Sequence, residues 1–199
     1  MRKFQRLASP SFLSEKWEQW GRDWEDRRST NPRATFHWHG IDGEPVNQKL
    51  LPTLKAQVQG HCSFCDHFPV CPPSTDTIEH FRPKTRFPRE AFQWENLFYC
   101  CNHCQKKGER YDDALLRPDG SDYVFDRFFI YDFTTGRIEP NPLASPVDQN
   151  RALITIDLYL LNEGHPSLRK RELRERAARP ADSLDDFAYR DFVGSLSCM

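Results

Sequence analysis

The sequence lacks several features, and each absence narrows the class of protein. No apolar run reaches the roughly 18 residues that a membrane span needs, so we expect no membrane-spanning segment. Residues 1–8 lack the apolar stretch of a secretory signal, which predicts a cytoplasmic protein. The formal net charge is only −1, so any surface for nucleic acid has to be a local basic patch. Internal repeats are also absent, and 199 residues fit one domain.

Away from its centre, the sequence predicts helices and one hairpin. Apolar periodicity favours helices over residues 11–28, 47–59, 147–162 and 167–179, a hairpin over 123–139, and a loop over 29–46. Ser11 or Ser14 is the expected cap of the first helix. Its tryptophans form a stripe that fits a core face or a docking surface, and the aromatic tail after Pro180 is either a docking segment or frayed.

Cysteine occurs seven times, and four of these residues form two Cys-x-x-Cys pairs. Cys62 and Cys65 make the first pair, and Cys101 and Cys104 make the second. This spacing is typical of a structural site in which four thiolates hold one Zn²⁺ in a tetrahedron. In a reducing compartment, clustered cysteines bind metal rather than forming disulfides. The sequence therefore predicts a zinc site that joins two distant parts of the chain.

Cys100 competes with Cys101 for a place in this site. Adjacent cysteines normally point apart, so only one of the two is expected to bind, and the two-residue gap to Cys104 favours Cys101. Cys71 lies in a proline-rich stretch and is expected to take no part.

A histidine, a carboxylate and a basic cluster lie between the two cysteine pairs. His80 follows Glu79, and the basic residues after them are Arg82, Lys84, Arg86 and Arg89. A neutral imidazole can accept a proton from water near neutral pH, a carboxylate can hold a hard divalent ion, and cations can hold phosphates. The segment therefore predicts phosphodiester chemistry at His80. His37 and His39 are a weaker metal candidate, because no third ligand lies nearby in the sequence.

The stretch over residues 62–108 resembles the HNH nuclease motif. The resemblance rests on Glu79-His80, Asn96-Leu97 and Cys101-x-x-Cys104 followed by Lys106-Lys107. The segments 78–84 (IEHFRPK) and 94–97 (WENL) are similar in particular to HNH proteins of the Septu anti-phage systems and of retrons with a comparable pair of effector genes. The resemblance implies an α+β fold in which flanking helices and a β-hairpin surround a zinc-stapled ββα-metal core. We expect a helical extension over residues 1–60, the HNH core over 61–120, and a hairpin with helices and a tail over 121–199, packed as one unit.

The resemblance also implies roles for individual residues. His80 matches the general base, Asn96 the residue that orients this base, and Glu79 the acid that binds a catalytic Mg²⁺ or Mn²⁺. Gln105 stands where the motif usually has His or Asn as the second metal ligand, and this departure leaves His103 or a water as alternatives. The residues expected to hold phosphates of the nucleic acid are Arg82, Lys84, Arg86, Lys106 and Lys107.

Two functions of different classes follow. The first is a metal-dependent endonuclease with DNA as the expected substrate and RNA as the alternative. The chain has no Walker motif, and Septu-like systems pair the nuclease with a separately encoded ATPase, so the resemblance implies that partner. The second is a zinc-stapled module that grips nucleic acid or a partner without cutting, in which Gln105 marks the lost chemistry.

Overall fold

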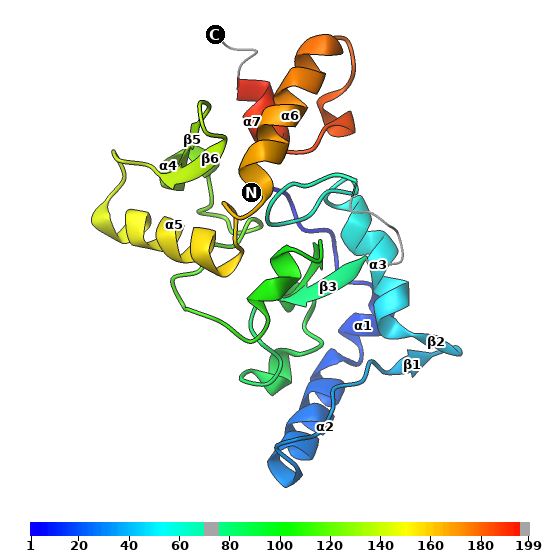
Figure 1. Ribbon diagram of the computed structural model, residues 1–199. Helices are drawn as coiled ribbons and strands as arrows, with labels where there is room; N and C mark the ends of the chain where they lie inside the picture. The colour runs from blue at the N-terminus through cyan, green and yellow to red at the C-terminus, as the bar shows by residue number, and fades with distance from the viewer. Residues whose placement is uncertain (70–75, 196–199) are drawn as a thin grey trace.

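The computed structural model describes residues 1–69 and 76–195, and it has a mixed α+β architecture (Figure 1). Cys71 lies outside the described residues. The elements in chain order are α1 (Ser11–Ser14), α2 (Trp17–Thr30), β1 (Gly40–Ile41), β2 (Glu44–Pro45), α3 (Val46–Ala56), β3 (Thr77–His80), η2 (Pro88–Glu90), η3 (Trp94–Asn96), β4 (Leu97–Cys100), η4 (Cys104–Lys107), α4 (Phe125–Phe128), β5 (Phe129–Asp132), β6 (Arg137–Pro140), α5 (Pro146–Leu158), α6 (His165–Ala178), η5 (Leu184–Asp186) and α7 (Arg190–Gly194). The strands of the described part form three separate two-stranded antiparallel sheets.

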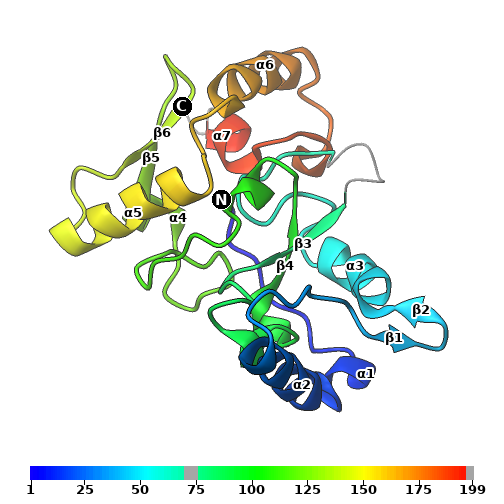
Figure 2. The same ribbon diagram turned by 60° about the horizontal axis from the view of Figure 1, so that its bottom comes forward.

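The β3–β4 hairpin lies at the centre of the molecule, between the N-terminal helices and the C-terminal elements (Figure 2). Its register pairs Glu79 with Phe98 and His80 with Leu97. All four residues of β4 are buried, as expected for a strand covered on both faces. Because successive side chains of a strand point to opposite faces, Glu79 and His80 project to different sides of the hairpin.

The N-terminal helix predicted over residues 11–28 is divided into α1 and α2. The chain leaves helical geometry at Lys16 (φ −126°), and neither serine caps a helix, since Pro10 precedes α1. Trp20 and Trp24 are buried, so the tryptophan stripe of α2 serves the interior. A side chain on Gly21 would place its Cβ 2.2 Å from the carbonyl oxygen of Arg89, so α2 and η2 can pack this closely only with glycine there.

The element that follows β4 differs from the expected helix of a ββα core. It is η4, a single 3-10 turn that ends where Gly108 takes a positive φ of 57°. Cys104, at the start of η4, belongs to the cysteine cluster, and Lys107, at its end, points inward. The turn is therefore fixed at both ends over four residues, and the chain leaves it at Gly108.

The C-terminal part follows the sequence prediction more closely. The hairpin forms as β5–β6, although α4 replaces the first half of its expected first strand, and α5 and α6 match the two predicted helices to within a few residues. The tail packs on the molecule through a second apolar cluster that includes Phe187, Tyr189 and Phe192. The guanidinium of Arg190 anchors it, since its Nη2 lies 2.6 Å from Oδ1 of Asp66 and both side chains are buried. The aromatic tail thus serves intramolecular packing.

The main apolar core runs through all three of the expected parts of the chain, from Leu13 in α1 through Phe98 in β4 to Leu161 after α5. One core therefore joins the N-terminal extension to the segment that carries the paired cysteines. Within residues 1–69 and 76–195, none of the helices combines the length and the apolar character that crossing a membrane requires.

Candidate functional site

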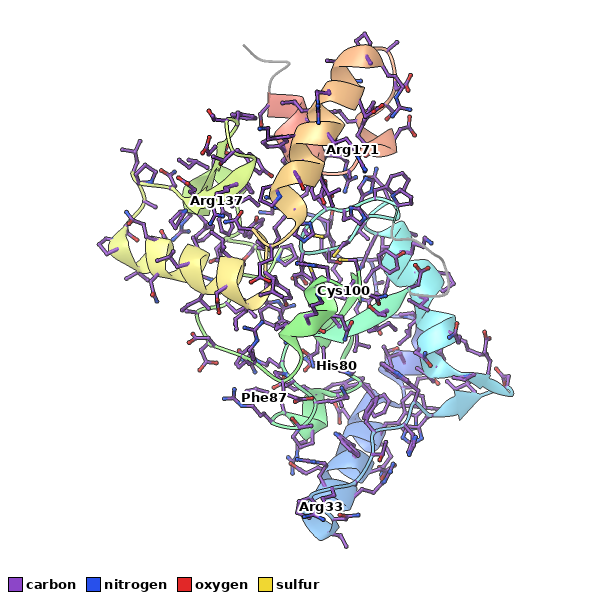
Figure 3. The ribbon with its side chains drawn as sticks, in the orientation of Figure 1. Arg33, His80, Phe87, Cys100, Arg137 and Arg171 are labelled. Carbon is purple, nitrogen blue, oxygen red and sulfur yellow. The ribbon has the colours of Figure 1, made fainter. Side chains whose placement is uncertain are left out.

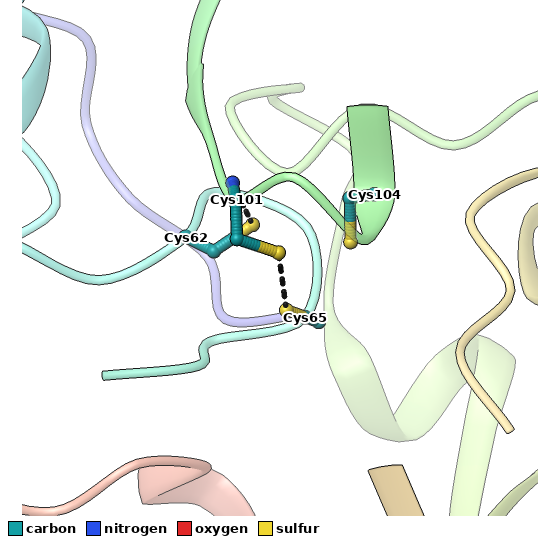
Figure 4. Close-up of side chains that lie close together, drawn as sticks. All are labelled: Cys62, Cys65, Cys101 and Cys104. Carbon is teal, nitrogen blue, oxygen red and sulfur yellow. Dashed lines mark hydrogen bonds between the residues drawn. The ribbon is translucent and has the colours of Figure 1, made fainter. Parts of the chain in front are cut away.

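The four cysteines of the two Cys-x-x-Cys pairs meet at one point. Their sulfur atoms all lie within 4.8 Å of one another, and all four residues are buried (Figure 4). In a tetrahedral site with Zn–S bonds of about 2.3 Å the sulfurs would be about 3.8 Å apart, so this cluster fits a zinc ion. The backbone N–H of Cys101 donates to Sγ of Cys62 over 3.4 Å, a contact typical of a thiolate ligand. The chain thus has a candidate structural zinc centre.

Cys101, rather than its neighbour, belongs to this cluster. Cys100 is the last residue of β4, and its thiol donates to the carbonyl of Cys101. It also lies next to the thiols of Cys62 and Cys104, but it is not one of the four residues whose sulfurs cluster. The two side chains point apart because they are successive residues at the end of a strand.

His80 is enclosed between the hairpin and the N-terminal segment (Figure 3). Its ring contacts Phe36 and Trp38, and its residue exposure is only 6%. Nε2 donates to the carbonyl of Ala91 over 3.0 Å, which leaves the lone pair on Nδ1. Burial lowers the pKa of His80 to about 3, with the nearby charge of Lys84 as the second cause. The imidazole is therefore oriented and neutral, but in this conformation it is a weak base.

Asn96 holds the loop that orients His80. Its amide oxygen accepts from the backbone N–H of Arg82 at 2.7 Å, and its amide nitrogen donates to the carbonyls of Arg82 and Glu90 at 3.0 and 2.9 Å. Ala91, whose carbonyl accepts from His80, directly follows Glu90. Asn96 thus acts on His80 indirectly, through the backbone that carries this acceptor.

Glu79 faces the other side of the hairpin, where it meets Lys107. The ammonium Nζ lies 2.7 Å from Oε1 of Glu79, and the side chains are 0% and 2% exposed. Lys107 also donates to the carbonyls of His80, Gly108 and Arg110 at 3.2–3.3 Å. Lys107 therefore shares its three protons among these carbonyls and the carboxylate of Glu79, with which it forms an ion pair. Burial raises the pKa of Glu79 to about 7, against the lowering effect of Lys107.

The two residues predicted to bind a catalytic divalent ion fit that ion only in part. Gln105 carries an enclosed side-chain oxygen without a hydrogen bond and Glu79 carries an enclosed carboxylate, and oxygens of this kind suit a hard cation. Lys107, however, already balances the carboxylate of Glu79. A divalent ion beside Glu79 would put two cations against each other, so this donor set does not fit a second cation in this conformation.

The basic residues predicted to hold phosphates divide into three groups. Arg86 and Lys106 are exposed. Arg82 and Lys84 are half-buried and pair with acids, Arg82 with Glu90 at 2.9 Å and Lys84 with Glu109 at 4.0 Å. Lys107 is enclosed within the protein and reaches no surface phosphate in this conformation.

Two contacts of the site lie outside the sequence predictions. Phe36 and Trp38, from a stretch expected to be a plain loop, cover His80, and the only signal for them was the alternation of aromatic and histidine residues over 36–39. His37 and His39 do not converge on a metal, because His37 is exposed and His39 stacks on Trp20 at 4.8 Å.

Comparison with known proteins adds no identification. The sequence matches no family model, and no curated protein is significantly similar to it. The functional interpretation therefore rests on the site itself and on the motif residues.

Proposed function

We propose that this protein is an HNH-type endonuclease that hydrolyses phosphodiester bonds of nucleic acid, with DNA as the substrate. The observation that carries the proposal is the arrangement around His80. A backbone carbonyl holds one ring nitrogen, and Asn96 braces the loop that supplies this carbonyl. Such an arrangement fixes the tautomer and leaves the lone pair of Nδ1 available to a water molecule.

In this proposal each residue of the site has a separate role. Nδ1 of His80 takes the proton from the attacking water, and Asn96 keeps the ring in place through the loop. The exposed cations Arg86 and Lys106 hold phosphates on either side without reading the bases. The zinc held by the four cysteines contributes folding free energy and fixes the hairpin against η4. No residue in this set reads sequence, so a partner or the shape of the substrate sets specificity.

A second ion, Mg²⁺ or Mn²⁺, belongs to the proposal as a cofactor that would stabilise charge on the phosphate. Glu79 and Gln105 would supply its protein ligands. In the conformation described, Lys107 is paired with Glu79, so Glu79 would have to leave Lys107 before it could bind this ion. We further propose that the protein works in the cytoplasm with a separately encoded ATPase of the Septu type.

The test is cleavage of plasmid DNA, and of single-stranded DNA and RNA in parallel, with Mg²⁺ or Mn²⁺ and with the ATPase present or absent. We expect cleavage by the wild type to disappear in His80→Ala. The matched control is His37→Ala, which removes an exposed histidine directly after Phe36 and should retain activity. The proposal fails if His80→Ala, with its zinc content unchanged, cuts as well as the wild type.

A specific observation favours the second function, a zinc-stapled module that binds without cutting. His80 is covered and Glu79 is neutralised by Lys107, so neither reactive group is available in the conformation described. This alternative predicts equal nucleic-acid binding by the wild type and His80→Ala, and no cleavage with either metal or with the ATPase.

A further inference from the structure

Residues 31–39, which we name the aromatic strap, lie over the His80 side of the hairpin. They form neither helix nor strand. Phe36 meets the imidazole edge-on with the ring centroids 5.5 Å apart, and Trp38 stacks on it at the same distance with 21° between the planes. His37 between them is exposed. The alternation is that of an extended chain that turns every second side chain toward His80.

Ring contacts, together with side-chain hydrogen bonds from Arg27 and Arg28 of α2 to the carbonyls of Thr35 and Pro32, hold the strap in place. Its ends are tied, since the N–H of Val46 donates to the carbonyl of His39 and the N–H of Asn31 donates to the carbonyl of Arg27. Between these ends, the backbone N–H groups of residues 35–38 make no hydrogen bond to other backbone within the part of the chain that is described. A segment held in this way opens locally at a lower cost than a strand or a helix does.

The strap and α2 form one unit that sits on the His80 loop. Trp24 packs on Phe36 at 5.3 Å, and Trp20 stacks on His39 at 4.8 Å. On the other side, α2 contacts η2 at Gly21, the residue whose Cβ would meet the carbonyl of Arg89 at 2.2 Å. The position of the strap therefore depends on the close approach of α2 to η2.

We propose that the aromatic strap is an autoinhibitory cover that must move off His80 before a phosphodiester can approach it. This inference rests on the proposed function and describes how the proposed nuclease activity is regulated. A base has to lie within reach of the water and the phosphodiester on which it acts, and the two rings cover the imidazole so that only 6% of the residue is exposed. A ligand that binds the uncovered form more tightly shifts the population toward it, and this gives a partner or the nucleic acid a way to switch the site on.

Diethyl pyrocarbonate tests the cover without any cleavage assay, because it acylates accessible imidazoles and peptide mass spectrometry identifies each modified histidine. In the zinc-loaded wild type we expect His37 to react and His80 to react at least ~10-fold more slowly, since modification requires opening. Trp38→Ala removes half of the cover and should raise the rate at His80 ~10-fold or more. Gly21→Ala, which lies outside the strap, should also raise the rate of modification at His80, because its Cβ forces α2 away from η2.

The control is His37→Ala, which changes the exposed face of the same strap and should leave the rate at His80 unaltered. Phe36→Leu is a milder variant for use if Trp38→Ala does not fold, and zinc content and melting temperature are recorded for each protein. The proposal is overturned if His80 in the wild type reacts as fast as His37. It is also overturned if the folded strap variants and Gly21→Ala leave the rate at His80 unchanged.

Cleavage by the same variants separates the cover from the proposed function. DNA cleavage that appears in Trp38→Ala and is lost on adding His80→Ala supports both. If Trp38→Ala speeds modification of His80 but the variant does not cleave DNA with Mg²⁺ or Mn²⁺, the result supports the cover and counts against the endonuclease.

Discussion

Lys107 and Glu79 form an ion pair inside the protein, with Nζ 2.7 Å from Oε1 and both side chains enclosed. The pair ties η4 to β3, since Lys107 also donates to the carbonyl of His80. Removing one partner of a buried pair leaves the other charge without compensation, whereas removing both can be nearly neutral. The pair therefore fixes the relative position of two elements of the site more than it adds stability.

Lys107→Met should lower the free energy of unfolding by about 3–5 kcal/mol, because Glu79 then stays buried without a cation. The double variant Glu79→Gln/Lys107→Met should recover most of this loss. Urea denaturation of the wild type, the two single variants and the double variant measures the coupling between the residues. Additive effects of the two single changes would contradict the pairing.

Stability should also depend on pH through Glu79. The pKa of Glu79 is raised from 4.5 to about 7, chiefly by burial, so the folded protein holds a proton that the unfolded chain releases. The stabilisation of the folded protein by the protonated Glu79 is fully present below about pH 4.5 and is lost as the pH rises to about 7. At about 1.4 kcal/mol per pH unit, the free energy of unfolding should fall by roughly 3 kcal/mol over this range.

Glu79→Gln supplies the reference for this measurement, because other groups, His80 among them, titrate in the same range and cancel in the comparison. The free energy of unfolding of the wild type minus that of Glu79→Gln should fall between pH 5 and pH 7. A difference that stays level or rises over this range would show that Glu79 is ionised throughout.

The cluster of four cysteines and most of the helices could be predicted from the sequence because their signals are local. Two Cys-x-x-Cys pairs specify a ligand set by spacing alone, and apolar periodicity marks a helix such as α5 wherever it packs.

The surroundings of His80 and Glu79 could not be predicted, because long-range packing decides them. Nothing near Trp38 in the sequence indicates that it stacks on a residue more than forty positions away. Lys107 looks like a surface cation next to Lys106, and only the 3-10 geometry of η4 turns it inward. In the same way Arg190 anchors a tail that has the composition of a frayed end, through an aspartate beside the first cysteine pair.

Loss of a zinc ligand should unfold the protein, and loss of Cys100 should not. Cys104→Ser removes one of four sulfurs from the cluster, and structural zinc contributes folding free energy directly, so we expect no bound zinc and no cooperative melting transition. Cys100→Ser is the matched control, because Cys100 is not one of the four clustered cysteines and the site keeps its four ligands. Metal analysis and thermal melting compare the two variants. Zinc at one equivalent in Cys104→Ser, or its loss from Cys100→Ser, would contradict the assignment.

Asn96 is expected to act through the loop rather than on a substrate. Asn96→Ala leaves the N–H and the carbonyl of Arg82 without their partner, whereas the carbonyl of Glu90 still accepts from the N–H of Gln93, so the free energy of unfolding should fall by about 1–3 kcal/mol. Asn96→Asp is the sharper variant, since it keeps the acceptor for the N–H of Arg82 but turns a second oxygen toward the carbonyls of Arg82 and Glu90. Both changes should free the carbonyl of Ala91 from its position and speed modification of His80 by diethyl pyrocarbonate. A stable Asn96→Ala protein with an unchanged rate at His80 would mean that the loop holds its shape without this side chain.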